Sequence, residues 1–149
     1  MDVHSKGGWP AAALSNFAPH PFQFDGVDCA SMEGLLQAFK VRDPDAEAQV
    51  CRLAGMAAKK AGSGRNWQRR QQLHWRGQTF DRKGRAYQAL LDRAFWALFT
   101  QNAKARRALL ATGDASLTHM VGKRKPAETV LTRSEFTRRL HTVRAELRG

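Results

Sequence analysis

Apolar and polar residues alternate in one short stretch of the chain, and this alternation predicts a β-hairpin. The letters FQFDGVDC, residues 22–29, place apolar residues at every second position on both sides of Asp25 and Gly26. Asp-Gly is a preferred pair for a two-residue hairpin turn, because both residues tolerate the backbone conformations that such turns require. We therefore expect a small antiparallel hairpin, with Phe22 and Phe24 on one face.

Helical spacing of apolar residues characterises the two segments that follow. Ser31 suits a helix N-cap and Glu33 complements the helix dipole in the first turn, so we expect a helix from about Met32 to Val41. The pair Asp43-Pro44 then begins a second helix, which should continue until the letters AGSG at residues 61–64 break it.

The remaining segments predict further helices and one strand. NWQRRQQLHWRG, residues 66–77, favours a short helix, and apolar residues recur at helical spacing from Arg85 to Leu110. LTHMV, residues 117–121, favours a strand before the basic loop GKRKP. A Thr-x-x-Glu capping box at residues 132–135 then starts a C-terminal helix. Residues 1–20 contain several Gly and Pro residues, and we expect them to be irregular with one short strand at most.

Length and element order together indicate one domain. The 149 residues match the usual size of a single domain, and no repeat, low-complexity tract or interdomain linker interrupts them. The expected elements are mostly helices, accompanied by one small antiparallel hairpin sheet. We therefore expect residues 1–149 to form a single, predominantly helical α+β domain.

The charge balance narrows the expected kind of partner. Twenty-five Lys and Arg residues against 13 Asp and Glu give a formal net charge of +12. This exceeds the magnitude of roughly 2 to 8 that suits a small domain. A positive surface favours phosphate-bearing partners, which means nucleic acid or a phosphorylated small ligand. A solvated surface that only aids solubility is the alternative.

The cysteines and the N-terminal segment indicate the cellular compartment to expect. Cys29 and Cys51 lack metal-ligand spacing, and the His, Asp and Glu residues show none either, so we expect no metal and no cofactor. The N-terminal letters MDVHSKGG contain no apolar segment that resembles a signal peptide or a membrane span. A reduced, cytoplasmic setting without membrane association is the expectation, with both thiols buried.

The letters SMEGLLQAFK, residues 31–40, contain the first candidate site. Each helical residue advances about 100°, so Glu33, Gln37 and Lys40 fall along one line of the predicted helix. That line borders the apolar stripe formed by Met32, Leu35, Leu36 and Phe39. The trio should therefore lie beside the buried face, where the edge of a cleft would be. A solvated flank with weak pairing between neighbouring side chains is the alternative.

Three ordered segments resemble one known family. They are LSNFAPHPFQFDGVDCASMEGLLQAFK (residues 14–40), AAKKAGSGR (residues 57–65) and YQALLDRAFWALFTQNAKARRALLATGD (residues 87–114). Together they are similar to the NADAR (NAD and ADP-ribose) superfamily, also called YbiA-like. The C-terminal third departs from this pattern, because the family's Asp-x-x-Trp-Gly segment is missing and His119 stands near a position where an acid is common.

The resemblance implies an N-glycosidase that cleaves bonds to ribose. Such a reaction builds positive charge on the sugar and negative charge on the leaving base, so a carboxylate and a proton donor both help. Glu33 is the candidate carboxylate. Lys40, partly desolvated, is the candidate nucleophile that would form a Schiff base with the opened sugar. The alternative is that Lys40 remains charged and holds a phosphate.

Further residues are candidates for ligand binding. Gln37 lies between the two catalytic candidates, and the SNF loop offers side chains suited to ribose or the base edge, namely Ser15, Asn16 and Phe17. Basic and aromatic residues near the Gly62–Gly64 turn suit a diphosphate and a stacked base, namely Lys60, Arg65, Trp67 and Trp75. The structural alternatives are that the SNF loop is an ordinary turn, that the Gly62–Gly64 segment only ends a helix, and that the tryptophans pack in the core. His74 and His119 are weaker candidates for acid–base roles.

Three functions remain open at this point. The first is removal of ADP-ribose from guanine bases of nucleic acid, which gives the positive surface a purpose. The second is hydrolysis of a free phosphoribosyl metabolite, such as a riboflavin-pathway intermediate. The third is a non-catalytic module that binds ADP-ribose or nucleic acid. An ADP-ribose-containing ligand and nucleic acid are the expected partners, while a toxin partner and the oligomeric state stay open.

Overall fold

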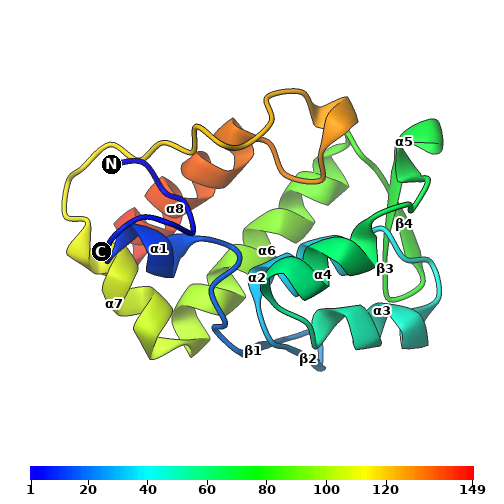
Figure 1. Cartoon of the computed structure of the whole chain (residues 1–149), viewed down its shortest axis with the longest axis horizontal. Helices are drawn as coiled ribbons and strands as arrows, with labels where there is room; N and C mark the ends of the chain where they lie inside the picture. The colour runs from blue at the N-terminus through cyan, green and yellow to red at the C-terminus, as the bar shows by residue number, and fades with distance from the viewer.

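Helices and two short hairpins make up a computed structural model that describes all residues from 1 to 149 (Figure 1). The α-helices are α1 (Ala11–Leu14), α2 (Met32–Ala38), α3 (Pro44–Cys51), α4 (Gly55–Gly62), α5 (Trp67–Arg70), α6 (Arg85–Gln101), α7 (Ala103–Ala111) and α8 (Arg133–Arg148), with a 3-10 helix η1 (Pro126–Glu128). The strands are β1 (Phe22–Phe24), β2 (Val27–Cys29), β3 (Gln72–Trp75) and β4 (Gln78–Asp81). The predicted, mainly helical α+β class is confirmed. No helix combines the length and apolar character needed to cross a membrane.

The hairpin predicted around Asp25 and Gly26 is confirmed. β1 pairs antiparallel with β2, and the two turn residues have positive φ values of 48° and 80°. Phe22 and Phe24 are both buried, as the alternation predicts. Gln23 and Asp28, the middle residues of the two strands, point to solvent, so the hairpin contributes one apolar face to the core that α6 and α2 share.

The helix α2 begins at its predicted N-cap and packs closely on its neighbours. The Ser31 hydroxyl accepts a hydrogen bond from the Gly34 amide (3.0 Å) and donates one to the Leu53 carbonyl (2.9 Å). A Cβ at Gly34 would lie 2.5 Å from that carbonyl, so glycine permits the close approach of α2 to the α3–α4 junction. The helix ends at Ala38, and Lys40 follows in a turn whose amide donates to the Gln37 carbonyl.

Two long predicted helices are each divided in the structure. The segment expected to run from Pro44 to residues 61–64 forms α3 and α4, because Gly55 takes a positive φ of 57° and redirects the chain. The segment expected to run from Arg85 to Leu110 breaks at Asn102, whose side chain caps the next helix by accepting from the Ala105 amide (3.0 Å). Helical periodicity persists across both breaks, so the apolar pattern alone predicts one helix.

The prediction for residues 66–77 was only partly right. α5 covers one turn and ends at Gln71, which has a φ of 54°, and the chain then forms the antiparallel hairpin β3–β4 around Arg76 and Gly77. The prediction of a strand at residues 117–121 was wrong, because only an isolated parallel bridge joins Thr118 to Asp2. Residues 1–20 contain the short helix α1 rather than a strand.

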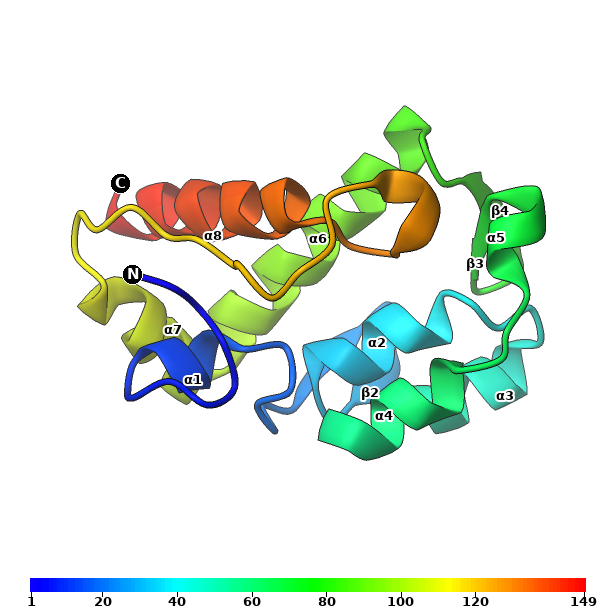
Figure 2. The same ribbon diagram turned by 45° about the horizontal axis from the view of Figure 1, so that its top comes forward.

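The C-terminal helix α8 starts as predicted, with both hydrogen bonds of the Thr132–Glu135 capping box present. It packs beside α6 and α7, while the segment between α7 and α8 crosses the molecule and brings η1 above α2 (Figure 2). One cluster of buried apolar residues includes members of α2, α6, α7 and α8. The two cysteines, Cys29 and Cys51, are free and buried within it.

Candidate functional site

A cavity of about 600 Å³ lies between α2 and the α7–α8 segment. Several separate parts of the chain line it: the N-terminal segment, the SNF loop, α2 with the turn that follows it, α4 with the turn that follows it, α5, and residues 119–131. Its volume lies within the range of roughly 300 to 1,000 Å³ that is usual for small-molecule sites. The cavity can therefore accept a nucleotide-sized ligand.

The line of polar residues on α2 and the turn after it faces this cavity. Glu33, Gln37 and Lys40 all line it, and the Gln37 amide nitrogen donates to the Glu33 carboxylate (2.8 Å). The Gln37 side chain is 7% exposed, and its Oε1 atom has no hydrogen-bond partner. A Cβ at Gly62 would lie 1.7 Å from that oxygen, so α4 presses directly on the Gln37 amide and fixes its position.

Burial shifts the pKa values of the two charged residues in opposite directions. Burial raises the pKa of Glu33, while the Gln37 hydrogen bond and the positive charge of Lys40 oppose the shift. Burial lowers the pKa of Lys40, and the negative charge of Glu33 opposes that shift. No ion pair joins the two groups. Both side chains are thus closer to their neutral forms than exposed residues would be.

The SNF loop is tied to the start of α2. The Asn16 carbonyl accepts a hydrogen bond from the Glu33 amide (3.0 Å), and the Ser15 hydroxyl accepts one from the Phe17 amide (3.2 Å). All three loop residues line the cavity. The structure therefore brings together six of the residues singled out from the sequence: Ser15, Asn16, Phe17, Glu33, Gln37 and Lys40.

The other four candidates lie elsewhere. Arg65 and Trp67 line a second, smaller cavity that Lys40 also borders. Lys60 is exposed and lines neither cavity, because its neighbour Lys59 occupies the face of α4 that borders the larger one. Trp75 is 2% exposed, stacks on Phe24 and donates to the Asp25 carboxylate (2.8 Å), so it is a core residue and we leave it out of the site.

Sequence reasoning missed the residues that complete the wall. They are His4, Ser5 and Lys6 from the N-terminal segment, Lys59, Ser63 and Gln68 near α4, and a stretch from Val121 to Leu131 that includes Lys123 and Glu128. The N-terminal segment reaches the cavity because the Val3 amide donates to the Thr118 carbonyl (2.8 Å). This long-range pairing leaves no local signal in the sequence.

The charge of the wall favours an anionic ligand. Four lysines line the cavity against two carboxylates, Glu33 and Glu128. His119 also lines it, with Nδ1 held 2.7 Å from the Val3 carbonyl and its ring edge-on against Phe136. Its ring is one more polar group on this wall.

A solved structure defines the fold class. The solution structure of the E. coli protein YbiA superposes on 99% of this chain and 84% of its own chain, with a TM-score of 0.67 at 21% identity. The chain therefore has a YbiA-like α+β fold, which confirms the fold that the sequence resemblance implied.

Sequence comparison defines the family. Residues 8–145 match the model of the bacteriophage protein GP30.3 family, and the chain belongs to that family. A relative from Enterobacteria phage T4, described as an uncharacterized 17.1 kDa protein in the Gp30-rIII intergenic region, is 35% identical over 151 residues. That alignment covers 99% of this chain and 98% of the relative.

Proposed function

We propose that this protein is an N-glycosidase that cleaves the bond between ribose and the nitrogen of a base, removing ADP-ribose from guanine in nucleic acid. The observation that supports this most is that Glu33 and Lys40 line the same cavity, with the pKa of Glu33 raised and the pKa of Lys40 lowered. A ligand-sized hollow with convergent polar groups and displaced pKa values is the usual setting for acid–base and covalent catalysis.

Lys40 acts as the nucleophile. In an amino-linked ribose the ring opens, so that C1 forms an imine with the base nitrogen. The neutral Lys40 amine adds to C1, the bond from C1 to the base nitrogen breaks, and the base leaves as its free amine. Water then hydrolyses the Lys40 imine, which regenerates the lysine and releases the sugar as an aldehyde that recloses. The lowered pKa of Lys40 supports this role because it provides more neutral amine at pH 7.

Glu33 transfers the protons that this sequence needs. Its raised pKa lets the carboxyl hold a proton and deliver it to the departing base nitrogen. Once ionised, the same carboxylate stabilises the cationic imine on the sugar. Gln37 positions Glu33 through the 2.8 Å hydrogen bond, and Gly62 in turn fixes Gln37.

The remaining wall suits the diphosphate and the ribose hydroxyls. Lys6, Lys59 and Lys123 approach the cavity from three separate segments and offer ammonium donors to phosphate oxygens. Asn16 offers both an amide donor and an amide acceptor to hydroxyl groups. No base specificity follows from these groups, so guanine enters the proposal through the family resemblance.

A non-catalytic ADP-ribose-binding module is the second candidate. The C-terminal third of the sequence favours it, because the Asp-x-x-Trp-Gly segment that belongs to the family resemblance is missing there. A free phosphoribosyl metabolite is a further substrate that the four lysines would accept. Turnover measured on different substrates separates these candidates from the proposed reaction.

The test is release of ADP-ribose from an ADP-ribosylated guanine oligonucleotide. Lys40→Ala should lower the rate by about 10³-fold or more, since it removes the nucleophile. Glu33→Gln should lower it by about 10² to 10⁴-fold, since it removes the proton donor. Lys60→Ala removes a lysine outside both cavities and should turn over like the parent.

Borohydride trapping tests the covalent step. Reduction during turnover should leave a sugar adduct on Lys40 that mass spectrometry locates. Parent-like turnover by Lys40→Ala would contradict the nucleophilic role. Tight ADP-ribose binding without turnover by the parent would favour the binding module instead.

A further inference from the structure

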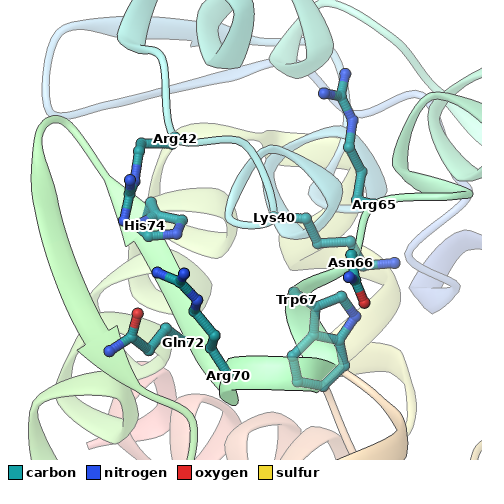
Figure 3. Close-up of a pocket in the computed structure, with 8 residues that line it drawn as sticks. All are labelled: Lys40, Arg42, Arg65, Asn66, Trp67, Arg70, Gln72 and His74. Carbon is teal, nitrogen blue, oxygen red and sulfur yellow. The ribbon is translucent and has the colours of Figure 1, made fainter.

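A second cavity of about 320 Å³ shares Lys40 with the proposed catalytic site. Its lining comes from the turn after α2, the turn before α5, α5 itself and the strand β3: Lys40, Arg42, Arg65, Asn66, Trp67, Arg70, Gln72 and His74. Figure 3 shows Arg42, His74 and Arg70 pointing toward one another, with Lys40 and Asn66 across from them. Lys40 lines both cavities, so the two adjoin at this residue.

The position of β3 explains why these side chains meet. The His74 amide donates to the Phe39 carbonyl (2.7 Å), which joins the strand to the last turn of α2 beside Lys40. Alternation along the strand then buries Leu73 and Trp75 in the core and directs Gln72 and His74 to the cavity. The His74 Nδ1 atom lies 3.2 Å from the Thr79 hydroxyl, which leaves Nε2 available to a ligand.

The cations of this cavity have no acidic partner. Lys40, Arg42, Arg65 and Arg70 line it, no Asp or Glu does, and none of these four takes part in an ion pair. Like charges that share a cavity repel one another, and a bound anion would relieve that repulsion. Guanidinium groups also match the geometry of phosphate oxygens, because each can donate two parallel hydrogen bonds.

The chemistry of the wall excludes an aromatic base as the main occupant. Trp67 is the one apolar residue of the lining, and only 6% of its surface is exposed. A stacked base needs a free aromatic face, which a buried indole does not offer. A compact, highly charged group fits the remaining polar side chains better.

We propose that this cavity binds a backbone phosphate of the nucleic-acid strand that carries the modified base. The inference rests on the proposed function, in which the larger cavity holds the ribose linked to that base. The phosphate next along the strand then lies beyond Lys40, between Arg42 and Arg70, while His74 and Gln72 donate hydrogen bonds to its oxygens. The cavity would thus distinguish a base within a strand from a free nucleoside.

The test is binding of a short, fluorescently labelled, unmodified single strand, measured by anisotropy at low and raised salt. Arg42→Ala combined with Arg70→Ala should weaken binding by about tenfold or more. It should also reduce the slope of log affinity against log salt by about 0.7 for each phosphate that the variant no longer neutralises. Both arginines are exposed and unpaired, so the fold should survive, as circular dichroism would check.

The matched control combines Arg107→Ala with Arg138→Ala. These arginines are exposed on α7 and α8, line neither cavity and form no ion pair, so the control removes the same charge. It should change affinity by less than about threefold, a loss of non-specific attraction. Equal losses in both double variants, or no loss in the cavity variant, would overturn the proposal.

Two features of the experiment distinguish a failure of this inference from a failure of the proposed reaction. Because binding is measured on an unmodified strand, a parent without activity would contradict the proposed function and leave the binding result standing. Inorganic phosphate, added as a competitor, identifies the occupant. Chemical-shift changes at His74 would show that inorganic phosphate binds the cavity. If they occur while the Arg42 and Arg70 variants bind the strand as tightly as the parent does, the cavity binds a free phosphate and the proposal of a strand phosphate is wrong.

Discussion

Charged side chains gather in two regions of this molecule, and they are partnered in opposite ways. Beneath the α6–α8 contact, the Arg82 guanidinium donates to both oxygens of Glu135 (2.6 and 3.1 Å) and to the Thr129 carbonyl (2.8 Å). Glu135 also accepts from Gln88 (2.6 Å) and from the Thr132 amide (2.8 Å). Around the end of α2, by contrast, the cationic side chains of both cavities form no ion pair.

The paired charges stabilise the fold, whereas the unpaired cations around the cavities are available to bind a ligand. A buried ion is tolerated when hydrogen bonds replace its lost water, and the Arg82–Glu135 pair meets that condition. The pair also acts on the larger cavity indirectly. Arg82 donates to the Thr129 carbonyl and Tyr87 donates to the Val130 carbonyl (2.5 Å). Thr129 and Val130 line the larger cavity, so the region around the Arg82–Glu135 pair fixes one wall of that cavity.

The largest effect should follow from breaking the buried pair. Arg82→Met leaves the Glu135 carboxylate buried without its main partner, which should lower the free energy of unfolding by about 3 to 5 kcal/mol. Burial alone would raise the pKa of Glu135, but the Arg82 and Thr132 hydrogen bonds hold it at about 2. The parent should therefore lose this stabilisation only as pH falls from about 4.5 toward 2. Urea denaturation measures both effects.

Two control variants make this result specific to the pair. Arg70→Met, on an exposed and unpaired arginine of the second cavity, should change stability by less than about 0.5 kcal/mol. Arg82→Met combined with Glu135→Gln removes the orphaned charge and should recover part of the loss. A loss for Arg70→Met as large as that for Arg82→Met would contradict the division into two kinds of charge.

Glu47 belongs to neither region and gives a second, smaller test. The residue is fully buried on α3, one carboxylate oxygen accepts from the Arg76 amide (3.0 Å), and the other has no partner. Burial raises its pKa to about 7. The folded state therefore holds a proton that the unfolded chain releases, and stability should fall as pH rises from about 4.5 through 7.

Glu47→Gln should remove this dependence. The variant should be more stable than the parent by about 2 kcal/mol at pH 8 and by much less at pH 5. Urea denaturation at the two pH values provides the comparison. An equal difference at both pH values would show that the carboxyl keeps its ordinary pKa in the folded protein.

Local signals were sufficient for the elements that begin and end with clear chemistry. The Asp25-Gly26 turn, the Ser31 cap, the Asp43 cap and the Thr132–Glu135 box all lie where the sequence predicts them. The β3–β4 hairpin was missed because Gln71 and Arg76 adopt positive φ values without being glycine. Their conformations are set by packing of Leu73 and Trp75 in the core, which no local pattern reveals.

The sequence predicted the site residues that lie on or just after α2, and those of the SNF loop that is hydrogen-bonded to it. Spacing along α2 places Glu33, Gln37 and Lys40 together, and the family resemblance adds the SNF loop. Lys123 and Lys6 could not be predicted in the same way, since the α7–α8 segment and the N-terminus reach the cavity through backbone pairing with each other. Trp75 shows the converse error, in which a tryptophan among arginines turned out to be part of the core.

The smallest effect concerns Gly62, which joins the packed interior to the proposed catalytic residues. Its backbone is helical, so alanine is tolerated there conformationally, but the new methyl group would meet Gln37 Oε1 at 1.7 Å. Gln37 must then turn away and release Glu33. Gly62→Ala should lower turnover by about tenfold, which corresponds to roughly 1.4 kcal/mol of transition-state stabilisation.

The pH profile distinguishes this positioning role from a general loss of structure. The Gln37 hydrogen bond lowers the pKa of Glu33, so its loss should raise that pKa further. The limb on which activity declines with rising pH, as Glu33 loses its proton, should move to higher pH in Gly62→Ala. Gly8→Ala is the matched control, since a Cβ there meets nothing within 4 Å and should alter neither rate nor profile. A slower Gly62→Ala enzyme with an unmoved profile would remove Gln37 from the proposed mechanism and leave Glu33 to be positioned by α2 alone.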